Sequence, residues 1–436
     1  MKKWMLEQLK LTVASLASKT VKKFKPTIVA VTGSVGKTST KEAIYSVLSA
    51  YRRVRKNVGN FNGELGLPLT ILGDWSENDL RVIARDSKNI STAKKAIFFI
   101  RVVLVSMLRL ALPRFLVRYI GGYPEILVLE YAADKPGDIK YLLEIAKPQI
   151  SILTAIGDVP VHVEFYDSPE AVLREKVRII EALPAAGLAI LNADEPRVLS
   201  CEEKTRATVL SFGFHSNADI QIKDFENKIE MIDGVLRPTG IIFKIGYEGS
   251  FVPVRIGGTL GRTQAYSAAV ACSVGMAFNL NLVQIAEALT YYQVPHQRMR
   301  FLAGVHHSTL VDDSYNASPL SMQSAIETMS SIKGSRKIAI LGDMRELGSF
   351  SKQAHHDIGL LAARVFSVII AVGPEAGEYV VTASKHRVAK KNLLHVERIE
   401  EVLPVLRDYI KEGDIVLIKG SHSMALEKAV VALQEI

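Results

Sequence analysis

A glycine-rich stretch near the start of the chain, residues 32–40 (TGSVGKTST), most constrains what this sequence can fold into. It follows an apolar run at residues 27–31 that reads as a buried strand, and it precedes a helix expected at about residues 38–50. Glycines let backbone N–H groups converge on phosphate oxygens, and a helix N-terminus adds the positive end of its dipole. The stretch therefore predicts a phosphate-binding loop.

The spacing of this loop is Gly-x-x-Gly-Lys-Thr, which is shorter than the strict Walker pattern because Val31 stands where that pattern has its first glycine. Lys37 can reach the β- and γ-phosphates, and the Thr38 hydroxyl can join a Mg²⁺ shell. The alternative is an ordinary glycine-rich turn. If the loop holds ATP, its nucleotide contacts are Gly33, Ser34, Val35, Gly36, Lys37, Thr38 and Ser39.

Short apolar runs alternate with helical stretches along the rest of the chain, which predicts an α/β fold with a mostly parallel sheet covered on both faces. Residues 218–256 differ, because short β-rich pieces separated by Gly and Pro suggest a small antiparallel appendage. The alternation restarts near residue 297. The expected strands lie at residues 126–129, 150–154, 188–191, 309–311, 337–341, 368–372 and 415–418, and one clear helix at 169–183.

The chain is too long for one ordinary core, since domains usually have about 100–200 residues. We expect an N-terminal amphipathic helix at 1–26, a central P-loop ATPase domain at 27–296 and a C-terminal Rossmann-like α/β domain at 297–436. The two cysteines, Cys201 and Cys272, lie far apart and lack metal-ligand spacing, which indicates a reducing compartment.

The net charge of +9 is unevenly distributed. Residues 1–26 contribute +6 and residues 81–120 contribute +8, which leaves the remaining residues at −5. Nucleic-acid-binding domains carry their basic patch on the folded reading surface, so we expect no nucleic-acid partner. The pattern instead indicates attraction to an anionic surface.

Both basic segments have helical character. In the first, Leu6, Leu9, Val13 and Leu16 recur at helical spacing, and polar residues interrupt the apolar stretch that a signal peptide would need. The second contains a very apolar run at 96–120 that four arginines and Pro113 interrupt. Charges near a bilayer centre are costly, so we expect a helix lying on a membrane surface. Packing on the protein or on a partner, and a membrane-spanning helix, are the alternatives.

The loop and seven further segments resemble motifs of the Mur ligase family and follow one another in the family's order. The family contains the enzymes that add D-alanyl-D-alanine to a muramoyl tripeptide, and the resemblance is closest to these. The segments are residues 59–68 (GNFNGELGLP), 127–130 with 136–139 (LVLE, PGDI), 162–168 (HVEFYDS), 191–195 (LNADE), 312–319 (DDSYNASP), 341–348 (LGDMRELG) and 419–421 (KGS).

The resemblance implies an ATP-dependent ligase that activates a carboxylate as an acyl phosphate and passes it to an amine. Thr38 and Glu130 are candidate Mg²⁺ ligands, and Glu130 ends an apolar strand where an unpaired carboxylate would be costly. By resemblance, His162 is a ligand of a second metal ion and Lys176 is carbamylated, becoming an anion that helps to hold Mg²⁺. Lys37, Lys176 and His162 are then the catalytic residues.

By the same resemblance, Arg298 stands at the hinge before the last domain and contacts the nucleotide after domain closure. Asp312 or Asp313 would accept hydrogen bonds from ribose hydroxyls, and Asn316 would shape the same pocket. Gln264 stands where the family has an asparagine near the adenine, and could still hydrogen-bond a purine edge. The alternative for the residues of the last domain is turn chemistry after a strand.

Two further departures from the family bear on the substrate. The glycine loop begins so early that the family's N-terminal UDP-binding domain is expected to be absent, and the basic apolar insertion at 81–120 replaces a short connection. The leading expectation is D-Ala-D-Ala addition to a muramoyl peptide in peptidoglycan precursor synthesis. The alternatives are a Mur-like amide ligase with a different, membrane-linked substrate and a non-catalytic ATP-binding scaffold.

These expectations also cover partners and location. We expect carboxylate and amine substrates of small-molecule or peptide size, no nucleic acid, and a monomer. We expect a cytoplasmic enzyme that contacts the inner face of the membrane peripherally through residues 1–26 and 81–120.

Overall fold

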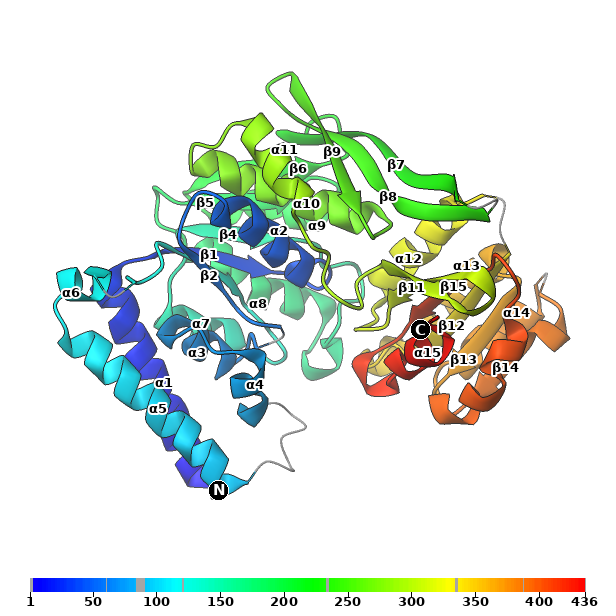
Figure 1. The fold of residues 1–436 in the computed structure, drawn as a ribbon, viewed down its shortest axis with the longest axis horizontal. Coiled ribbons are helices and arrows are strands. Elements are labelled where there is room, and N and C mark those ends of the chain that lie inside the picture. The colour runs from blue at the N-terminus through cyan, green and yellow to red at the C-terminus, as the bar shows by residue number, and fades with distance from the viewer. Residues whose placement is uncertain are drawn as a thin grey trace.

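The computed structural model describes residues 3–59, 61–83, 91–119, 121–232, 235–333, 336–386 and 388–435. Two sheets with their helices lie side by side, and two long helices project from the first sheet on the side away from the second (Figure 1). The predicted insertion at 81–120 falls partly outside this description, since residues 84–90 and 120 are not among the described ones.

The first sheet has the strand order β2-β3-β1-β4-β5-β6-β7-β8-β9. Neighbouring strands pair parallel from β2 to β7, and β7, β8 and β9 pair antiparallel. The order reverses at β1, and ligands of such sheets bind outside the carboxyl ends of the strands at this point. The bounds are β1 Thr27–Thr32, β2 Val54–Lys56, β3 Ile126–Glu130, β4 Ile150–Leu153, β5 Leu188–Asn192, β6 Thr208–Gly213, β7 Ile220–Ile232, β8 Val235–Tyr247 and β9 Ser250–Gly257.

Alternate residues of the central strands face opposite layers of helices. In β1, Ile28 and Ala30 belong to one buried cluster, and Val29 and Val31 belong to the other. Such strands read as continuous apolar runs because both faces are covered. The layer on one face contains α2 Lys37–Ser49, α10 Arg262–Ala277 and α11 Leu282–Thr290. The layer on the other face contains α1 Lys3–Phe24, α3 Gly66–Leu72, α7 Asp138–Ile145 and α8 Pro169–Glu181. Two further helices, α4 Glu77–Leu80 and α9 Pro196–Leu199, are short.

The β-rich region at 218–256 pairs antiparallel, as expected, but it is part of the main sheet and not an appendage, which corrects the expectation from the sequence. Its strand β7 pairs parallel with β6, so β7, β8 and β9 extend the main sheet. The β7–β8 hairpin is long and reaches the second half of the molecule, where Ile229 packs against the core of the other sheet (Figure 1). Asn227 Nδ2 also donates to Ser331 Oγ at 2.9 Å.

The second sheet has the order β10-β11-β15-β12-β13-β14, and its pairs are parallel except β10–β11. Helices α12, α13 and α14 pack on one face and α15 on the other. This confirms the expected second α/β unit. The bounds are β10 Arg300–Gly304, β11 Ser308–Asp313, α12 Pro319–Ser331, β12 Lys337–Gly342, α13 Ser351–Val365, β13 Val368–Val372, α14 Gly377–Ser384, β14 Leu393–Val396, β15 Ile415–Lys419 and α15 Glu427–Leu433.

The two basic segments form one helical arm, which we define as α1 together with α5 (Thr92–Ala111) and α6 (Arg114–Tyr119). Helix α5 contacts both α1 and α3, and Phe98, Phe99 and Val102 are buried in that contact. Part of the insertion therefore packs on the protein, as one alternative predicted. Across the described ranges, no helix combines the length and the apolar character that crossing a membrane requires.

Candidate active site

The glycine loop joins β1 to α2 at the reversal point of the sheet. Gly33 has φ +148°, and a Cβ there would lie 2.0 Å from Thr154 Oγ1, so the position requires glycine. Gly36, with φ +87°, directly precedes α2. Ser34 N–H donates to Ala155 O at 2.6 Å, which holds the loop against the end of β4. The Ser34 hydroxyl is buried and has no hydrogen-bond partner among the described residues, so it is a polar group that a bound phosphate could satisfy.

Lys37 folds back over this loop, where its Nζ donates to Gly33 O at 2.9 Å. Burial lowers the pKa of Lys37, the Glu130 carboxylate opposes this shift, and the Arg298 guanidinium adds to it. The ammonium therefore lies within the electrostatic reach of β3 and of the segment before β10. This is the expected place for a lysine that would neutralise transferring phosphate oxygens.

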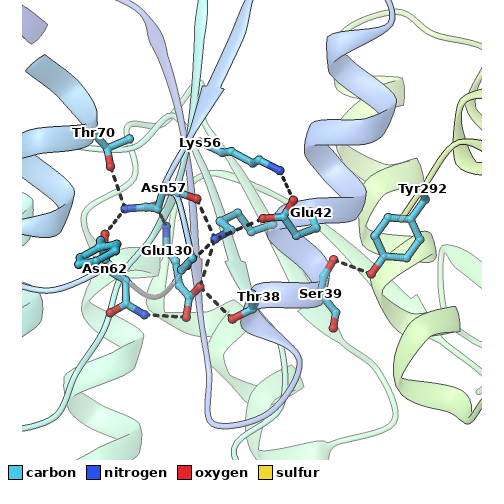
Figure 2. A network of polar contacts seen from close by, with 12 residues as sticks. Thr38, Ser39, Glu42, Lys56, Asn57, Asn62, Thr70, Glu130 and Tyr292 are labelled. Atoms are coloured by element: carbon cyan, nitrogen blue, oxygen red, sulfur yellow. Dashed lines mark hydrogen bonds and ion pairs between the residues drawn. The ribbon is translucent and has the colours of Figure 1, made fainter. Parts of the chain in front are cut away.

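Glu130 at the end of β3 is buried and held from several sides (Figure 2). Its Oε2 accepts from Thr38 Oγ1 at 3.1 Å, and its Oε1 accepts from Asn62 Nδ2 at 2.8 Å. The backbone N–H of Glu130 donates to Asn57 Oδ1 at 2.6 Å. The two predicted metal ligands, Thr38 and Glu130, are thus adjacent oxygen groups, which fits the preference of Mg²⁺ for oxygen.

Lys41 lies beside this carboxylate and is fully buried, although no sequence motif singles it out. Its Nζ is 3.9 Å from Glu130 Oε2 and 3.5 Å from Glu42 Oε1. It also donates to the carbonyl oxygens of Asn57 at 2.9 Å and Gly59 at 3.0 Å. A buried cation with this many oxygen partners fixes both the Glu130 carboxylate and the start of the loop at 59–65.

Lys176 in α8 is almost completely buried, as a catalytic lysine can be. Burial lowers the pKa of Lys176 to about 7, and the Lys37 ammonium adds to the shift. Asp134, Glu175 and Glu130 act in the opposite direction. A lysine in this state is partly uncharged near neutral pH, and only an uncharged amine can react with an electrophile.

His162 follows β4 in a left-handed conformation, with φ +70°. Its Nε2 lies 3.4 Å from Asp134 Oδ1, and its Nδ1 lies 2.5 Å from Glu346 Oε2 in the second half of the molecule. Asp134 acts electrostatically on both Lys37 and Lys176 as well. This carboxylate therefore connects the three predicted catalytic residues into one site.

Arg298 and Asp313 meet the glycine loop from the other half of the molecule. The Arg298 guanidinium lies 4.1 Å from the centre of the Tyr315 ring, and Lys419 Nζ lies 2.6 Å from Asp313 Oδ2. Met299 N–H donates to Asp313 Oδ1 at 3.1 Å. A small cleft of about 40 Å³ beside Thr38 is lined by Arg298, Asp313 and Lys419, among others.

The other predicted nucleotide contacts have internal partners. Gln264 is buried, its Nε2 donates to Ser39 Oγ and Arg298 O, and its Oε1 accepts from Tyr292. Asp312 Oδ1 accepts from the N–H and the hydroxyl of Ser314. Asn316 Oδ1 accepts from Ala317 N–H, and Asn316 O accepts from Lys419. These hydrogen bonds give each of the three side chains a structural role within the protein. Of Gln264, Asp312 and Asn316, only Gln264 lines the small cleft.

A much larger cavity of about 700 Å³ lies on the β4 and β5 side of the glycine loop, between the two halves of the molecule. Such a volume lies within the range of about 300–1,000 Å³ that small-molecule sites occupy. Gly36 and Thr263 line it on one side, with Asn192 and Asp194 from the end of β5. Residues of α12 (Pro319, Leu320, Gln323 and Ser324) and of α13 close it from the second half.

Sequence reasoning missed several residues of this site. No sequence pattern points to Asn57 or Lys41, because an asparagine near a short strand and a lysine in a helix usually lie on the surface, whereas here both are buried. Asn62 and Glu346 lie inside the motifs at 59–68 and 341–348, so position within a motif could have pointed to them. Asp134 lies just before the 136–139 turn, and only the fold shows its closeness to His162.

Two family models match the chain. "Mur ligase middle domain" matches residues 31–84 and 106–274, and "Mur ligase, glutamate ligase domain" matches residues 297–422. The UDP-N-acetylmuramoyl-tripeptide--D-alanyl-D-alanine ligase of Bacillus subtilis is 29% identical over 94% of this chain and 76% of its own length. The Escherichia coli protein of that name is 26% identical over 94% of this chain and 77% of its own length.

Solved structures agree with these matches. MurF ligase from Thermotoga maritima in complex with ADP superposes with a TM-score of 0.74, at 27% identity, over 97% of this chain and 83% of that one. Mycobacterium tuberculosis folylpolyglutamate synthase complexed with ADP has a TM-score of 0.65 at 13% identity, over 98% of each chain, which shows the shared fold alone. Since the middle-domain model by itself covers more than half of the residues, the chain belongs to the Mur ligase family of ATP-dependent ligases.

Proposed function

We propose that this ligase adds D-alanyl-D-alanine to a muramoyl peptide through an acyl phosphate, in the synthesis of peptidoglycan precursors. The names of the relatives from B. subtilis and E. coli support the reaction and the substrates. The observation that carries the proposal is the buried Thr38–Glu130 pair beside the glycine loop, with Lys176 within its electrostatic reach. This arrangement suits phosphoryl transfer to a carboxylate.

The reaction needs the γ-phosphoryl group of ATP to move to the carboxylate of the muramoyl peptide. Negative charge spreads over the transferring oxygens, so positive groups must surround them. Lys37 supplies one such group, and Arg298 approaches it from the second half of the molecule. The amine of D-Ala-D-Ala then attacks the acyl phosphate, and phosphate leaves.

Thr38 and Glu130 would hold Mg²⁺, since they offer adjacent oxygen atoms next to the loop that would hold the phosphates. Bound Mg²⁺ would neutralise charge on the phosphate oxygens. Asn62 and Lys41 keep the Glu130 carboxylate in place for this purpose. Asn62 donates a hydrogen bond to Oε1, and the Lys41 ammonium lies 3.9 Å from Oε2.

Lys176 would be carbamylated and would join His162 in holding a second Mg²⁺. A buried amine whose pKa is lowered to about 7 can be uncharged at neutral pH, which carbamylation by CO₂ requires. The resulting anion would also relieve the repulsion between Lys176 and Lys37. His162 lies next to Asp134, a further carboxylate on the same side of the site.

The base and the sugar of ATP would occupy the cavity of about 700 Å³, because the cleft of about 40 Å³ beside Thr38 is too small for them. Gly36 lines both spaces, so a nucleotide could run from the large cavity across the loop. Gly33, Ser34, Val35 and Ser39 would then contact phosphate, and Asp313 and Arg298 would meet the nucleotide from the second half.

In this proposal residues 27–296 form the ATP-binding domain, and residues 297–436 form the domain that completes the site. The enzyme is a monomer. It contacts the inner face of the membrane peripherally through residues 1–26 and 81–120. Cytoplasmic peptidoglycan precursors are the natural substrates of such a location. A Mur-like ligase with a different, membrane-linked acceptor is the second candidate, and the exposed apolar face of the helical arm favours it.

The test is phosphate release from ATP with a panel of muramoyl peptides and other carboxylates, each with and without D-Ala-D-Ala. We expect release only when UDP-muramoyl tripeptide and D-Ala-D-Ala are both present, and we expect Lys37→Met and Glu130→Gln to abolish it. Release with a lipid-linked carboxylate alone would favour the second candidate. Nucleotide binding without release for any pair would indicate a scaffold and contradict the proposal.

A further inference from the structure

Helix α5 of the helical arm has two apolar faces, and only one of them is covered. Phe98, Phe99 and Val102 point into the core with α1 and α3. On the other side Ile97, Ile100, Leu104, Met107 and Leu108 form a continuous stripe at helical spacing, and each is 57–66% exposed. Phe115 of α6, at 69% exposed, lies just beyond the end of this stripe in the chain. We call these six residues the α5 stripe.

The helix that carries the α5 stripe is firmly attached through its other side. Lys23 Nζ of α1 donates to the carbonyl oxygens of Leu110 at 2.7 Å and of Leu112 at 2.5 Å, so it caps the C-terminal end of α5. The Arg109 guanidinium donates to Leu72 O in α3. The outward position of the stripe therefore results from packing and hydrogen bonds, and a soluble protein rarely exposes such a patch without a partner.

The charge around the α5 stripe is mainly positive. Residues 91–119 contain six lysines and arginines and no aspartate or glutamate. Lys94 and Arg101 lie at one edge of the stripe by helical periodicity, and Arg114 precedes Phe115. Arg101 pairs with Asp79 at 3.4 Å, and its side chain stays more than half exposed. The rest of the enzyme, apart from the two basic segments, carries a net negative charge. An apolar stripe bordered mainly by cations is complementary to an apolar layer covered by anionic headgroups.

We propose that the α5 stripe inserts into the surface of a bilayer containing anionic phospholipids, with α5 lying along the surface. This inference names the lipid partner of the peripheral contact proposed above and rests on that proposal, but it does not depend on the identity of the ligase substrates. Apolar insertion supplies the affinity, and the cations of α5 and α6 make it selective for anionic headgroups.

The arm also connects to the active site. Lys10 of α1 lies 2.7 Å from Glu64 Oε2, and Lys135 lies 3.1 Å from Glu64 Oε1. Glu64 belongs to the segment that carries Asn62, the partner of Glu130. A bilayer bound to the arm would therefore lie on the same half of the molecule as the Glu130 side of the site, away from the second sheet (Figure 1).

The experiment is cosedimentation of the full chain with vesicles of phosphatidylcholine alone or with phosphatidylglycerol. We expect the wild-type chain to bind the anionic vesicles at least about tenfold more tightly than the neutral ones. The variant Ile100→Glu/Leu104→Glu/Leu108→Glu should bind them at least about tenfold more weakly than wild type, because three apolar side chains no longer insert. Its thermal unfolding and its phosphate release in solution should match those of wild type, since the three side chains are exposed.

The matched control is Val283→Glu/Val381→Glu/Val431→Glu, which adds the same charge at exposed valines on other helices and should bind like wild type. Equal binding of both triple variants, or no binding of wild type to anionic vesicles, would overturn the inference. Self-association that the α5 variant abolishes while vesicle binding persists would assign the stripe to a second copy of the chain. Vesicle binding without phosphate release for any substrate pair would contradict the proposed ligase function alone.

Discussion

At the scale of single residues, the site brings together buried charged side chains, each of which would be costly to bury without a partner of opposite charge. Three lysines, Lys37, Lys41 and Lys176, lie within electrostatic reach of one buried carboxylate, Glu130. Lys41 has four oxygen partners. Burial, together with the Lys37 ammonium, lowers the pKa of Lys176 to about 7. We therefore expect the two lysines to differ in role: Lys41 positions a carboxylate, and Lys176, with its lowered pKa, takes part in the chemistry.

The positioning role of Lys41 can be tested with Lys41→Met. Removing one partner of a buried ion pair leaves an uncompensated charge, so we expect the free energy of unfolding to fall by about 3–5 kcal/mol. The Mg²⁺ concentration needed for half-maximal phosphate release should also rise, because Glu130 loses a support. Urea unfolding and magnesium titrations measure the two effects.

Lys56→Met is the control for this prediction. Lys56 pairs with Glu42, but it is partly exposed, so its loss should cost only about 0–1 kcal/mol and leave the magnesium dependence unchanged. A Lys41→Met protein as stable as the Lys56→Met protein would show that Lys41 has no such role.

Lys176 gives a prediction about pH. Its pKa is about 7 in the folded chain and near 10.5 when unfolded, so between these values the unfolded chain binds more protons. Stability should therefore rise with pH across this window, and Lys176→Met should lack this contribution. In CO₂-free buffer, we expect the wild type to gain about 1–3 kcal/mol over Lys176→Met between pH 7 and 9.5 in urea unfolding. Parallel pH dependences of the two proteins would contradict the lowered pKa.

At the scale of elements, the sequence predicted most of the sheet that carries the site. The strand at 27–31 and the helix near 38–50 were nearly correct, because a run covered on both faces and a glycine turn are local signals. The strand at residues 54–56 was missed, since VRK lacks an apolar pattern. The sequence predicts the antiparallel pairing at 220–247 but not its place in the main sheet, because the pairing of β7 with β6 is a nonlocal contact that periodicity cannot reveal.

The same limit applies to the site. Thr38 and Glu130 could be predicted, because each stands next to a strand or a glycine turn with a clear local signal. Glu346 and His162 are 184 residues apart in the chain and meet only through the packing of the two halves. That Gln264 can hydrogen-bond a purine edge stays a prediction. In the fold, Tyr292, which follows α11, donates to Gln264 Oε1 at 2.8 Å. Partners from distant elements decide these roles.

The β7–β8 hairpin makes a prediction as an element that joins the two halves. Asn227 donates to Ser331 Oγ in α12 at 2.9 Å and accepts from Gly261 N–H before α10 at 2.9 Å. Asn227→Ala should lose both contacts and lower the free energy of unfolding by about 1–3 kcal/mol. Ser331→Ala keeps the contact with Gly261, but it removes the contact with Asn227 and the hydrogen bond from Ser331 Oγ to Thr328 O at 2.7 Å within α12. We expect it to cost less than Asn227→Ala, because the Thr328 carbonyl lies in a helix end where water can replace the hydroxyl. Equal losses in urea unfolding would show that the contact with Gly261 contributes no more than the one with Thr328.

At the scale of the whole molecule, the cavity of about 700 Å³ exists because the two halves face each other across the glycine loop. Few polar contacts hold the described residues of the two halves in this position near the site. One is His162 Nδ1 with Glu346 Oε2 at 2.5 Å, and another is Glu164 N–H with Glu346 O at 3.3 Å. The side chains of this pair are partly exposed, so the pair should be worth only about 0–1 kcal/mol.

Because so few polar contacts hold the two halves together near the site, their relative position should be sensitive to the loss of the Glu346 charge. Glu346→Gln keeps the shape of the side chain but removes its charge, and a loss of about 1 kcal/mol changes the ratio of two conformations about fivefold. We expect a larger radius of gyration in small-angle scattering without nucleotide, and a return to the wild-type value when ATP bridges the halves. Glu412→Gln, an exposed change after the last 3₁₀ turn before β15, should leave the scattering unchanged. If Glu346→Gln scatters like wild type in both conditions, packing of the β7–β8 hairpin against α12 must hold the two halves together, and the Asn227→Ala protein should then show the expansion instead.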